Sequence, residues 1–459
     1  MLGTAVIKKV VVKNFKCIKE LELELAPLTI LVGPNGSGKS SILEAIALMA
    51  QCAKLGADPR GALRGEFVEY EDLKSILPAG REDAELTLGL SLDICIEEVK
   101  EAFEKDLIEF SNRAADLSSP YRESYTTYLK LLQDLSQYMS GREVVEVRYE
   151  YSYAYDTASH AHTLCIGKHC MSYGRNGLEE KWSTGSPQLR LRANNAFLAP
   201  FIVGGYGSNF ACSVMDAVKR RLTKVYYISA ERGGMPWRYN ASEKHGWVGK
   251  RGEYTLEVVA ELMKPPNDER WAPYGILCEV FGVRRAWAGW EEGSYLTSSY
   301  VDPYLGSAHK FPLLGHGAKQ LLPVIAQLAY SEPGSVILVE EPEISLHPAH
   351  QRLLPVLFGL AVTESKQIIV TTHSSYFPLS LNLVLEGEGY ALKGWTPTGE
   401  REYRVKLSPK DVAVYHVTRD EEGWTRVERL ELNEKGLKKG CFGFHNHSFH
   451  FLDLMCKPS

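Results

Sequence analysis

The chain has 459 residues, 44% of them hydrophobic and 24% charged, which is an ordinary composition for a globular protein large enough for two lobes. A formal net charge of -5 excludes a strong overall attraction to nucleic acid or anionic membranes, although this sum can hide a local basic groove. The sequence has no apolar run near the roughly 20 residues of a membrane helix and no signal-peptide core, and its nine cysteines are scattered. We therefore expect a cytoplasmic protein with no membrane attachment and no disulfide framework.

In chain order, the N-terminal region changes from strand patterns to a helical pattern and back. Residues 5–15 are rich in Val and Ile, and residues 21–32 contain an alternating strand followed by the continuously apolar LTILV. Residues 40–54 place apolar side chains at helical spacing, and residues 84–94 predict another strand.

The middle of the chain has a different character. Residues 97–139 are charged and helical in pattern, with a break at Ser118-Ser119-Pro120, and predict two helices of about 20 residues, each about 30 Å long. Sustained heptads are missing, so a long coiled coil is not expected. Residues 143–175 alternate and are rich in Tyr and Val, which predicts a β-hairpin region.

The C-terminal part again predicts alternating strands and helices. Residues 335–339 and 367–373 are apolar strands, and residues 350–362 form a helix between them. This order favours a parallel sheet, which both ends of the chain would build. We predict an α/β P-loop head with a mixed sheet, made of residues 1–95 and 221–432. An inserted helical and β lobe (96–220) and a tail (433–459) complete the chain.

The clearest motif is GPNGSGKS at residues 33–40, which fits the phosphate-binding pattern G-x-x-x-x-G-K-[ST] in full. It lies between a predicted buried strand and a predicted helix, where glycines let backbone N–H groups turn toward phosphate oxygens and the helix N-terminus adds positive charge. Lys39 is expected to reach the β- and γ-phosphates of ATP, and the Ser40 hydroxyl to ligate Mg²⁺. The expected nucleotide-binding residues of this loop are Asn35, Gly36, Ser37, Gly38, Lys39 and Ser40.

Two acids follow the apolar strand VILV, at the sheet edge where the phosphates would lie. Glu340 is predicted to hold Mg²⁺ directly or through water, and Glu341 to be the general base that polarises the attacking water. His373 follows the next strand and is predicted to contact the γ-phosphate or to position that water. The alternatives are an acidic loop that caps a helix and a structural histidine. The complete phosphate-binding loop favours the catalytic interpretation.

The phosphate-binding loop, EEPEISLHP and TTHS, in this order, resemble the ABC-type ATPases of the SMC, RecF and OLD class. The resemblance implies that Glu340 occupies the Walker B metal position, Glu341 that of the catalytic glutamate, and His373 that of the switch histidine. The opening VKNFKCI, which contains Lys16, is similar to the strand that passes beside the nucleotide in this class.

The segment LLGHGAKQ resembles the G-x-G-x-x-Q form of the signature motif, found in an OLD-like AAA subgroup of this class. This resemblance assigns nucleotide contacts to Gly315, Gly317 and Lys319. The familiar signature serine is Gly315 here, and Lys319 replaces a small polar residue. Lys319 could supply positive charge to a partner's γ-phosphate, as an arginine finger does, or it could be a solvated helix lysine.

The resemblance further implies a homodimer in which two ATP molecules lie between head-to-tail subunits. The leading hypothesis is an ATP-dependent dimer switch that acts on or with DNA or RNA, in repair or in defence against foreign DNA. The alternative is a nucleotide-gated regulatory ATPase that acts through a protein partner without nucleic acid. A transporter subunit is disfavoured because the signature lies far from the phosphate-binding loop and no membrane segment is evident. No nuclease motif is evident either, so DNA cleavage would need a separate nuclease partner.

Weaker signals remain open. The His/Cys clusters at residues 160–170 and 441–456 contain zinc-type ligands but lack the paired spacing of a zinc site. Basic runs at residues 219–224 and at Arg284 and Arg285 are either nucleic-acid contacts or solvated faces. Glu231, Arg232 and Arg251 lie in segments shared with the subgroup, without an assigned chemistry.

Overall fold

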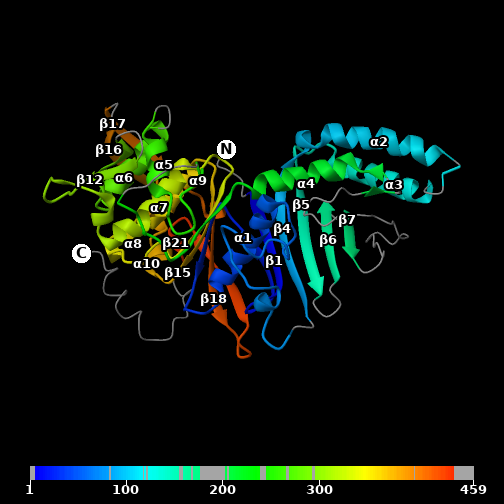
Figure 1. The fold of residues 1–459 in the computed structure, drawn as a ribbon, viewed down its shortest axis with the longest axis horizontal. Helices are drawn as coiled ribbons and strands as arrows, with labels where there is room; N and C mark the ends of the chain where they lie inside the picture. The colour runs from blue at the N-terminus through cyan, green and yellow to red at the C-terminus, as the bar shows by residue number, and fades with distance from the viewer. Residues whose placement is uncertain are drawn as a thin grey trace.

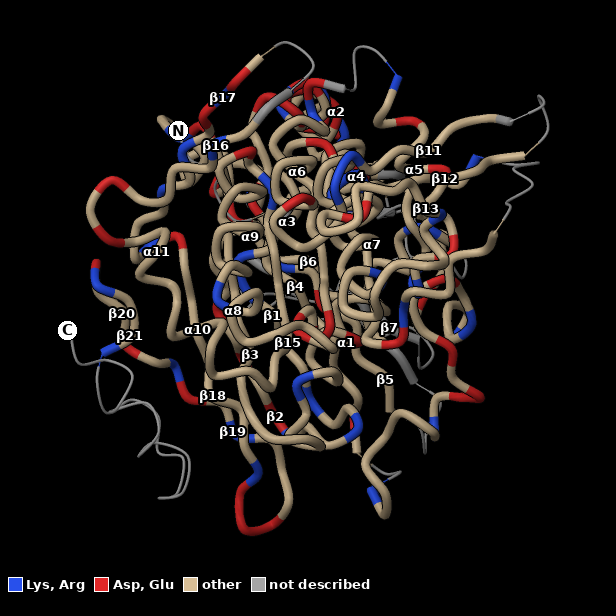
Figure 2. The backbone as a smooth tube through the Cα atoms, turned by 90° about the vertical axis from the view of Figure 1, so that its left-hand side faces the viewer, with Lys and Arg blue, Asp and Glu red and all other residues tan. Residues whose placement is uncertain are grey.

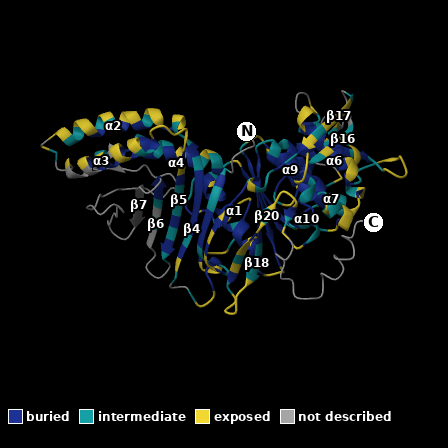
Figure 3. Ribbon diagram, turned by 180° about the vertical axis from the view of Figure 1, so that it is seen from behind, coloured by how far each residue is buried: buried dark blue, intermediate teal, exposed yellow. Residues whose placement is uncertain are grey.

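The computed structural model describes residues 6–81, 84–116, 118–119, 122–154, 159–166, 169–175, 202–203, 206–237, 244–264, 268–291, 295–396 and 399–438. The molecule is elongated, with two six-stranded sheets at its centre and helices at both ends (Figure 1). Buried residues concentrate in the sheets and in the helices that cover them, whereas α2 carries many exposed residues (Figure 3).

One sheet is antiparallel and is built from the first half of the chain. Its strands, in spatial order, are β2 (Ile18–Glu24), β1 (Ile7–Phe15), β4 (Glu85–Cys95), β5 (Val144–Ala154), β6 (Ser159–Ile166) and β7 (His169–Arg175). The predicted hairpin region at residues 143–175 therefore extends the sheet of the N-terminal strands.

The second sheet joins the two ends of the chain. Its strands, in spatial order, are β10 (Val225–Ile228), β14 (Val336–Glu340), β15 (Gln367–Thr372), β3 (Leu28–Val32), β18 (Val412–Arg419) and β19 (Thr425–Leu430). The first five are parallel, and β19 returns antiparallel to β18. The predicted α/β architecture, with a mixed sheet that both ends of the chain build, is confirmed.

The helices flank these sheets, and α1 contacts strands of both. Those described are α1 (Lys39–Leu55), α2 (Lys100–Ala115), α3 (Arg122–Met139), α4 (Asn209–Leu222), α5 (Thr255–Leu262), α6 (Asp268–Val280), α7 (His316–Tyr330), α8 (Pro348–Gln351), α9 (Leu354–Thr363), α10 (Tyr376–Leu379) and α11 (Asn382–Leu385). The two helices predicted around a break at residues 118–120 are α2 and α3. The single helix predicted over residues 350–362 is wrong in extent, because a turn at Arg352 and Leu353 separates α8 from α9.

Smaller sheets complete the described chain. They contain β8 (Ile202–Val203) with β9 (Tyr206–Gly207), β11 (Arg284–Glu291) with β12 (Tyr295–Val301) and β13 (Ala308–His309), β16 (Tyr390–Thr396) with β17 (Gly399–Val405), and β20 (Leu432–Asn433) with β21 (Gly436–Leu437).

A buried glutamine fastens the antiparallel sheet to the parallel one. Gln367 begins β15, and its side-chain amide accepts from Ile7 N at 2.8 Å and donates to Ile7 O at 2.7 Å. The same amide also donates to Ala26 O at 3.2 Å. Because both polar ends of this buried side chain are satisfied, the contact fixes the position of β1 relative to the second sheet.

Basic and acidic residues are interspersed along the backbone of the described chain (Figure 2). The basic run at residues 219–224, which covers the last turn of α4 and the residues just after it, is partly neutralised within the chain. Arg220 and Arg221 both pair with Glu98, at 3.1 and 2.5 Å, and Lys224 pairs with Glu332 at 3.1 Å. These ion pairs favour the solvated-face interpretation of this run. No helix among the described residues is long and apolar enough to span a bilayer.

Candidate functional site

The loop after β3 turns tightly because two glycines leave space that a side chain would fill. A Cβ at Gly33 would lie 2.1 Å from Val417 O, and one at Gly38 would lie 2.1 Å from Thr425 Oγ1. Gly38 also has a φ of 105°, in a region that non-glycine residues rarely adopt. Residues 33–40 therefore approach the C-terminal strands more closely than a chain with side chains at these positions would allow.

Lys39 begins α1 and folds back over the loop. Its Nζ donates to Gly33 O at 2.9 Å and to Pro34 O at 2.8 Å. Burial lowers the pKa of Lys39 to about 8, while the carboxylates of Glu341, Glu343 and Glu340 oppose this shift. Lys39 Nζ also lies 3.5 Å from Ser37 Oγ, so this buried ammonium contacts only neutral oxygens of the loop and is well placed to bind an anion.

A cavity of about 330 Å³ lies at this loop, and its lining comes from both the N-terminal and the C-terminal parts of the chain. Its lining residues are Cys17, Asn35, Gly36, Ser37, Gly38, Lys39, Ser40, Ser41, Glu341, His373 and Arg419. The loop residues that the sequence selected thus share a cavity with two of the three polar side chains that it selected near the ends of β14 and β15.

The acidic pair ends strand β14. Glu340 is 8% exposed, and its Oε2 accepts from Ala230 N at 3.2 Å. Glu341 has a φ of 44°, which turns its side chain out of the strand direction, and its Oε1 lies 3.2 Å from His373 Nε2. Positive φ is uncommon outside glycine and is often found where function requires a special geometry. The sequence-selected acid and histidine are therefore in direct contact.

The third glutamate of the same motif was not selected from the sequence. Glu343 Oε1 accepts from His373 N at 2.6 Å and from Ser374 N at 3.2 Å, so this carboxylate holds the chain at the end of β15. Its Oε2 is buried and has no hydrogen-bond partner among the described residues. The acid spacing E-E-x-E is evident in the sequence, but the contacts of the Glu343 carboxylate with backbone N–H groups are not.

Arg232, which had no chemistry assigned from sequence, lies buried behind the acidic pair. Its guanidinium donates to Glu340 O at 2.6 Å, Glu341 O at 2.7 Å and Ser229 O at 2.7 Å. Its Nε donates to Gln320 O at 2.7 Å, and Gln320 Nε2 donates back to Arg232 O at 2.6 Å. One side chain therefore ties helix α7 to the peptide groups that flank Glu341.

The β18–β19 hairpin holds the phosphate-binding loop from the C-terminal side. Arg419 Nε donates to Gly36 O at 2.7 Å, and Thr425 Oγ1 donates to Ser37 O at 3.0 Å. Arg419 also donates to Gly423 O at 2.6 Å, which closes its own turn. These two residues were missed from the sequence, because their partners are backbone carbonyls nearly 400 residues away.

The residues of the expected signature motif lie outside this cavity. Gly315 precedes α7, and a Cβ at Gly317 would lie 2.5 Å from Ser345 O. His316 Nδ1 lies 2.9 Å from Ser345 Oγ, so the start of α7 packs on the loop after the acids. Lys319 is partly exposed on the first turn of α7.

Lys16 is placed beside the cavity and does not line it. Its Nζ forms an ion pair with Glu44 of α1 and lies 4.8 Å from the centre of the Tyr70 ring. Lys16 has a φ of 53°, in a turn that brings its neighbour Cys17 into the cavity lining.

The donor set of the cavity fits a magnesium nucleotide. The Ser40 hydroxyl and the Glu341 carboxylate line the cavity, and Glu340 ends β14 next to Glu341 in the chain; all three are hard oxygen ligands of the kind that Mg²⁺ prefers. Lys39 and the loop N–H groups at the start of α1 match a polyphosphate. The unpartnered Glu343 Oε2 adds a further acceptor near the ends of β14 and β15.

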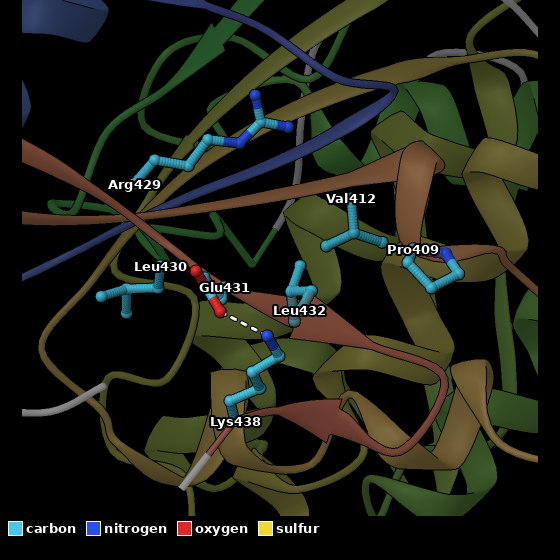
Figure 4. Close-up of a pocket in the computed structure, with 7 residues that line it drawn as sticks. All are labelled: Pro409, Val412, Arg429, Leu430, Glu431, Leu432 and Lys438. Carbon is cyan, nitrogen blue, oxygen red and sulfur yellow. Dashed lines mark hydrogen bonds and ion pairs between the residues drawn. The ribbon is translucent and has the colours of Figure 1, made fainter. Parts of the chain in front are cut away.

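A second cavity of about 350 Å³ lies along the C-terminal strands (Figure 4). Two charged side chains that line this cavity, Lys438 and Glu431, form an ion pair with each other. Arg429, which also lines it, pairs with Glu24 at 3.3 Å. Since these charges compensate one another within the chain, this cavity lacks the reactive groups of the first.

The described residues contain no group of three or more His, Cys, Asp or Glu side chains that could hold a metal ion. Within the first His/Cys cluster, Cys165 is disulfide-bonded, a bond that the cysteine spacing did not predict. The second cluster lies outside the described part of the chain.

Comparison with protein families gives two matches. Residues 6–233 match the model described as AAA ATPase domain. Residues 298–380 match the model described as AAA domain, putative AbiEii toxin, Type IV TA system.

Curated relatives match over short stretches. The OLD nuclease of Thermus scotoductus is 54% identical over 43 residues, which are 9% of this chain and 8% of that protein. Structural maintenance of chromosomes protein 6 of Saccharomyces cerevisiae is 41% identical over 85 residues, 18% of this chain and 7% of that protein. DNA replication and repair protein RecF of Vibrio vulnificus is 36% identical over 66 residues, 14% of this chain and 17% of that protein. The chain thus spans less than a fifth of the length of each of these three relatives.

Among solved structures, the SMC head domain from Thermotoga maritima covers 93% of this chain and 99% of its own, at 14% identity and a TM-score of 0.40. An SmcHead bound to the C-winged helix domain of ScpA covers 93% and 98%, at 13% identity and a TM-score of 0.45.

Proposed function

We propose that this chain, which belongs to the ABC-type ATPases of the SMC, RecF and OLD class, is an ATP-dependent dimer switch that acts on or with nucleic acid. The observation that carries the proposal is the single cavity that joins the complete phosphate-binding loop to Glu341 and His373. ATP would bind between two head-to-tail copies, and its hydrolysis would release them.

In this proposal the loop residues from Asn35 to Ser40 bind the triphosphate. Lys39 exchanges its contacts with Gly33 O and Pro34 O for phosphate oxygens, and this exchange relieves the cost of its burial. Ser40 and Glu340 hold Mg²⁺, which would neutralise charge that develops on the phosphates.

Glu341 accepts a proton from the attacking water as general base. His373, at 3.2 Å from the Glu341 carboxylate, orients that carboxylate and the γ-phosphate. Glu343 keeps His373 in place through the His373 backbone N–H. The partner subunit would supply the residues equivalent to Gly315, Gly317 and Lys319, which lie outside the cavity of their own chain.

The link to nucleic acid is supported by the relatives, which include an OLD nuclease and a DNA replication and repair protein. We propose a role in repair or in defence against foreign DNA, with cleavage carried out by a separate nuclease partner. A nucleotide-gated regulator that acts through a protein partner remains the second candidate, because the net charge of -5 provides no overall attraction to nucleic acid.

Arg419→Ala is expected to weaken ATP binding about tenfold, because the loop loses a charged hydrogen bond to Gly36 O and becomes less ordered before binding. The measurement is ATP affinity by calorimetry. Arg426→Ala, which changes another exposed arginine of the same hairpin, is the matched control and should bind ATP normally. Equal affinities of the two variants would show that the hairpin does not order the loop.

The nucleic-acid role is tested by ATP turnover with and without duplex DNA, single-stranded DNA and RNA. We expect at least one of them to stimulate turnover. Slow turnover that none of them changes would contradict this role and favour the protein-gated regulator.

A further inference from the structure

Exposed aromatic side chains gather on one small sheet, formed by β11, β12 and β13, which packs on α5 and α6. Where the structure describes burial, the exposed Trp and Tyr residues are Trp287, Trp290, Tyr295 and Tyr304, with Trp237 as the one example elsewhere. The first four lie on β11, β12 and the turn from β12 to β13. We call the described part of residues 284–309 the β-arm. A folded domain normally exposes large aromatic rings singly, so such a group indicates a binding surface.

The strand pairing of the β-arm fixes how these rings are displayed. Residues that pair across antiparallel strands share a face of the sheet, so Trp287, Gly289 and Tyr295, the partner of Glu291, lie on one face of the hairpin. Ala288 and Leu296 are buried on the other face. Trp290, the partner of Leu296, lies on that second face near the end of the hairpin and is 44% exposed. Tyr304, in the following turn, is 94% exposed.

Gly289 has no side chain and so leaves space for the Trp287 ring. A Cβ at this position would lie 2.4 Å from Trp287 Cζ2, so the indole lies against the Gly289 backbone. The Trp287 indole therefore packs against the backbone of its own strand. Trp287 is also 44% exposed to solvent. A ring held in this way needs little further ordering before a flat partner stacks on it.

Two uncompensated positive charges stand at the base of the same strand. The strand register shifts between Arg284 and Trp287, and Arg285 has a φ of 47°, so both consecutive arginines are exposed. In the described part of the chain, neither guanidinium has a hydrogen-bond or ion-pair partner. The basic run at residues 219–224 differs, because Arg220 and Arg221 are paired with Glu98.

We propose that the β-arm binds single-stranded nucleic acid, with bases stacked on Trp287 and Tyr295, which share one face of the hairpin, and backbone phosphates paired with Arg284 and Arg285. Free guanidinium groups on the same strand as a supported indole match a chain that offers both negative charges and flat apolar bases. In duplex DNA the bases are stacked on each other and are not available to these rings. This inference rests on the proposed nucleic-acid role and narrows its substrate class.

The test is the affinity of the full chain for labelled oligothymidylate and oligouridylate, measured by fluorescence anisotropy in the presence and absence of ATP. Trp287→Ala with Tyr295→Ala should weaken binding about tenfold or more, because each stacked base contributes about 1–3 kcal/mol. Arg284→Ala with Arg285→Ala should reduce the salt dependence of binding, by about 0.7 in logarithmic slope for each lost phosphate contact. Basal ATP turnover should not change in either variant.

Matched controls come from the same chain. Trp237→Ala removes an exposed tryptophan outside the β-arm, and Arg220→Ala removes a paired arginine; both should bind as the unaltered protein does. Gly289→Val, which pushes the Trp287 ring off its support, should weaken binding without removing any aromatic group.

The proposal is overturned if the unaltered protein binds neither oligonucleotide, or if the β-arm variants bind as tightly as the controls. Nucleic-acid stimulation of turnover that survives in the β-arm variants would sink this inference alone and leave the proposed function in place. Loss of self-association in the β-arm variants, with oligonucleotide affinity unchanged, would identify the surface as a contact between copies and would also overturn it.

Discussion

Glu341→Gln is expected to reduce ATP turnover by roughly two to four orders of magnitude, the usual contribution of a positioned general base. The amide has the shape of the carboxylate but cannot take a proton from water. The Lys39 contacts and the rest of the phosphate-binding loop are untouched by this change, so ATP should bind with near-normal affinity. Because bound ATP would no longer be consumed, the variant should also accumulate the ATP-bound dimer.

The measurements are single-turnover hydrolysis, ATP affinity and sedimentation with ATP. Glu386→Gln, an equally conservative change at an exposed position away from the cavity, is the control and should behave as the unaltered protein. Near-normal turnover in Glu341→Gln would assign the water-activating role to another group, and Glu340 and Glu343 would be examined next. Loss of ATP binding would instead indicate that Glu341 shapes the loop.

Arg232→Met should lower the free energy of unfolding by about 3–5 kcal/mol, because it leaves several buried carbonyl oxygens without a donor. The guanidinium is 6% exposed and donates to four carbonyl groups, those of Ser229, Gln320, Glu340 and Glu341. Methionine has similar length and fills the space, so the loss measures the hydrogen bonds more than a cavity. Denaturant unfolding is the measurement.

Arg251→Met is the matched control. Its side chain is 64% exposed and pairs with an exposed Glu231 at 3.4 Å, so its removal should change stability by less than about 1 kcal/mol. Arg232→Lys keeps the charge but cannot reach all four oxygens, and we expect a folded protein with reduced kcat and near-normal KM for ATP. If Arg232→Met were as stable as the control, the guanidinium would not hold α7 to the acidic pair.

The parts of the site that were predicted from sequence are those written in contiguous motifs. Residues 33–40 directly follow one strand, and residues 336–341 contain another strand with the two acids at its end. In both segments the reactive side chains are close in sequence to the strand, so the local sequence pattern is enough to locate them. The parallel sheet followed from apolar strands separated by a helix. Glu341 and His373 were each selected from the sequence as residues at strand ends, but their direct contact was not predicted.

The missed parts depend on contacts between distant segments. The run VAVYHV at residues 412–417 has strand character, but nothing local shows that β18 pairs with β3 from the start of the chain. Arg419 and Arg232 bind backbone carbonyls, which leave no signature in the partner's sequence. The ion pair of Lys16 with Glu44 likewise needed the relative placement of β1 and α1.

The position of β3 between β15 and β18 also determines when the site can form during synthesis. The phosphate-binding loop is synthesised well before Thr425, which holds Ser37 O from 388 residues further along the chain. A nascent chain that ends before β18 would carry every residue of the loop without the hairpin that orders it. The loop would therefore reach its ordered form only after β18 and β19 have been synthesised and have paired with β3.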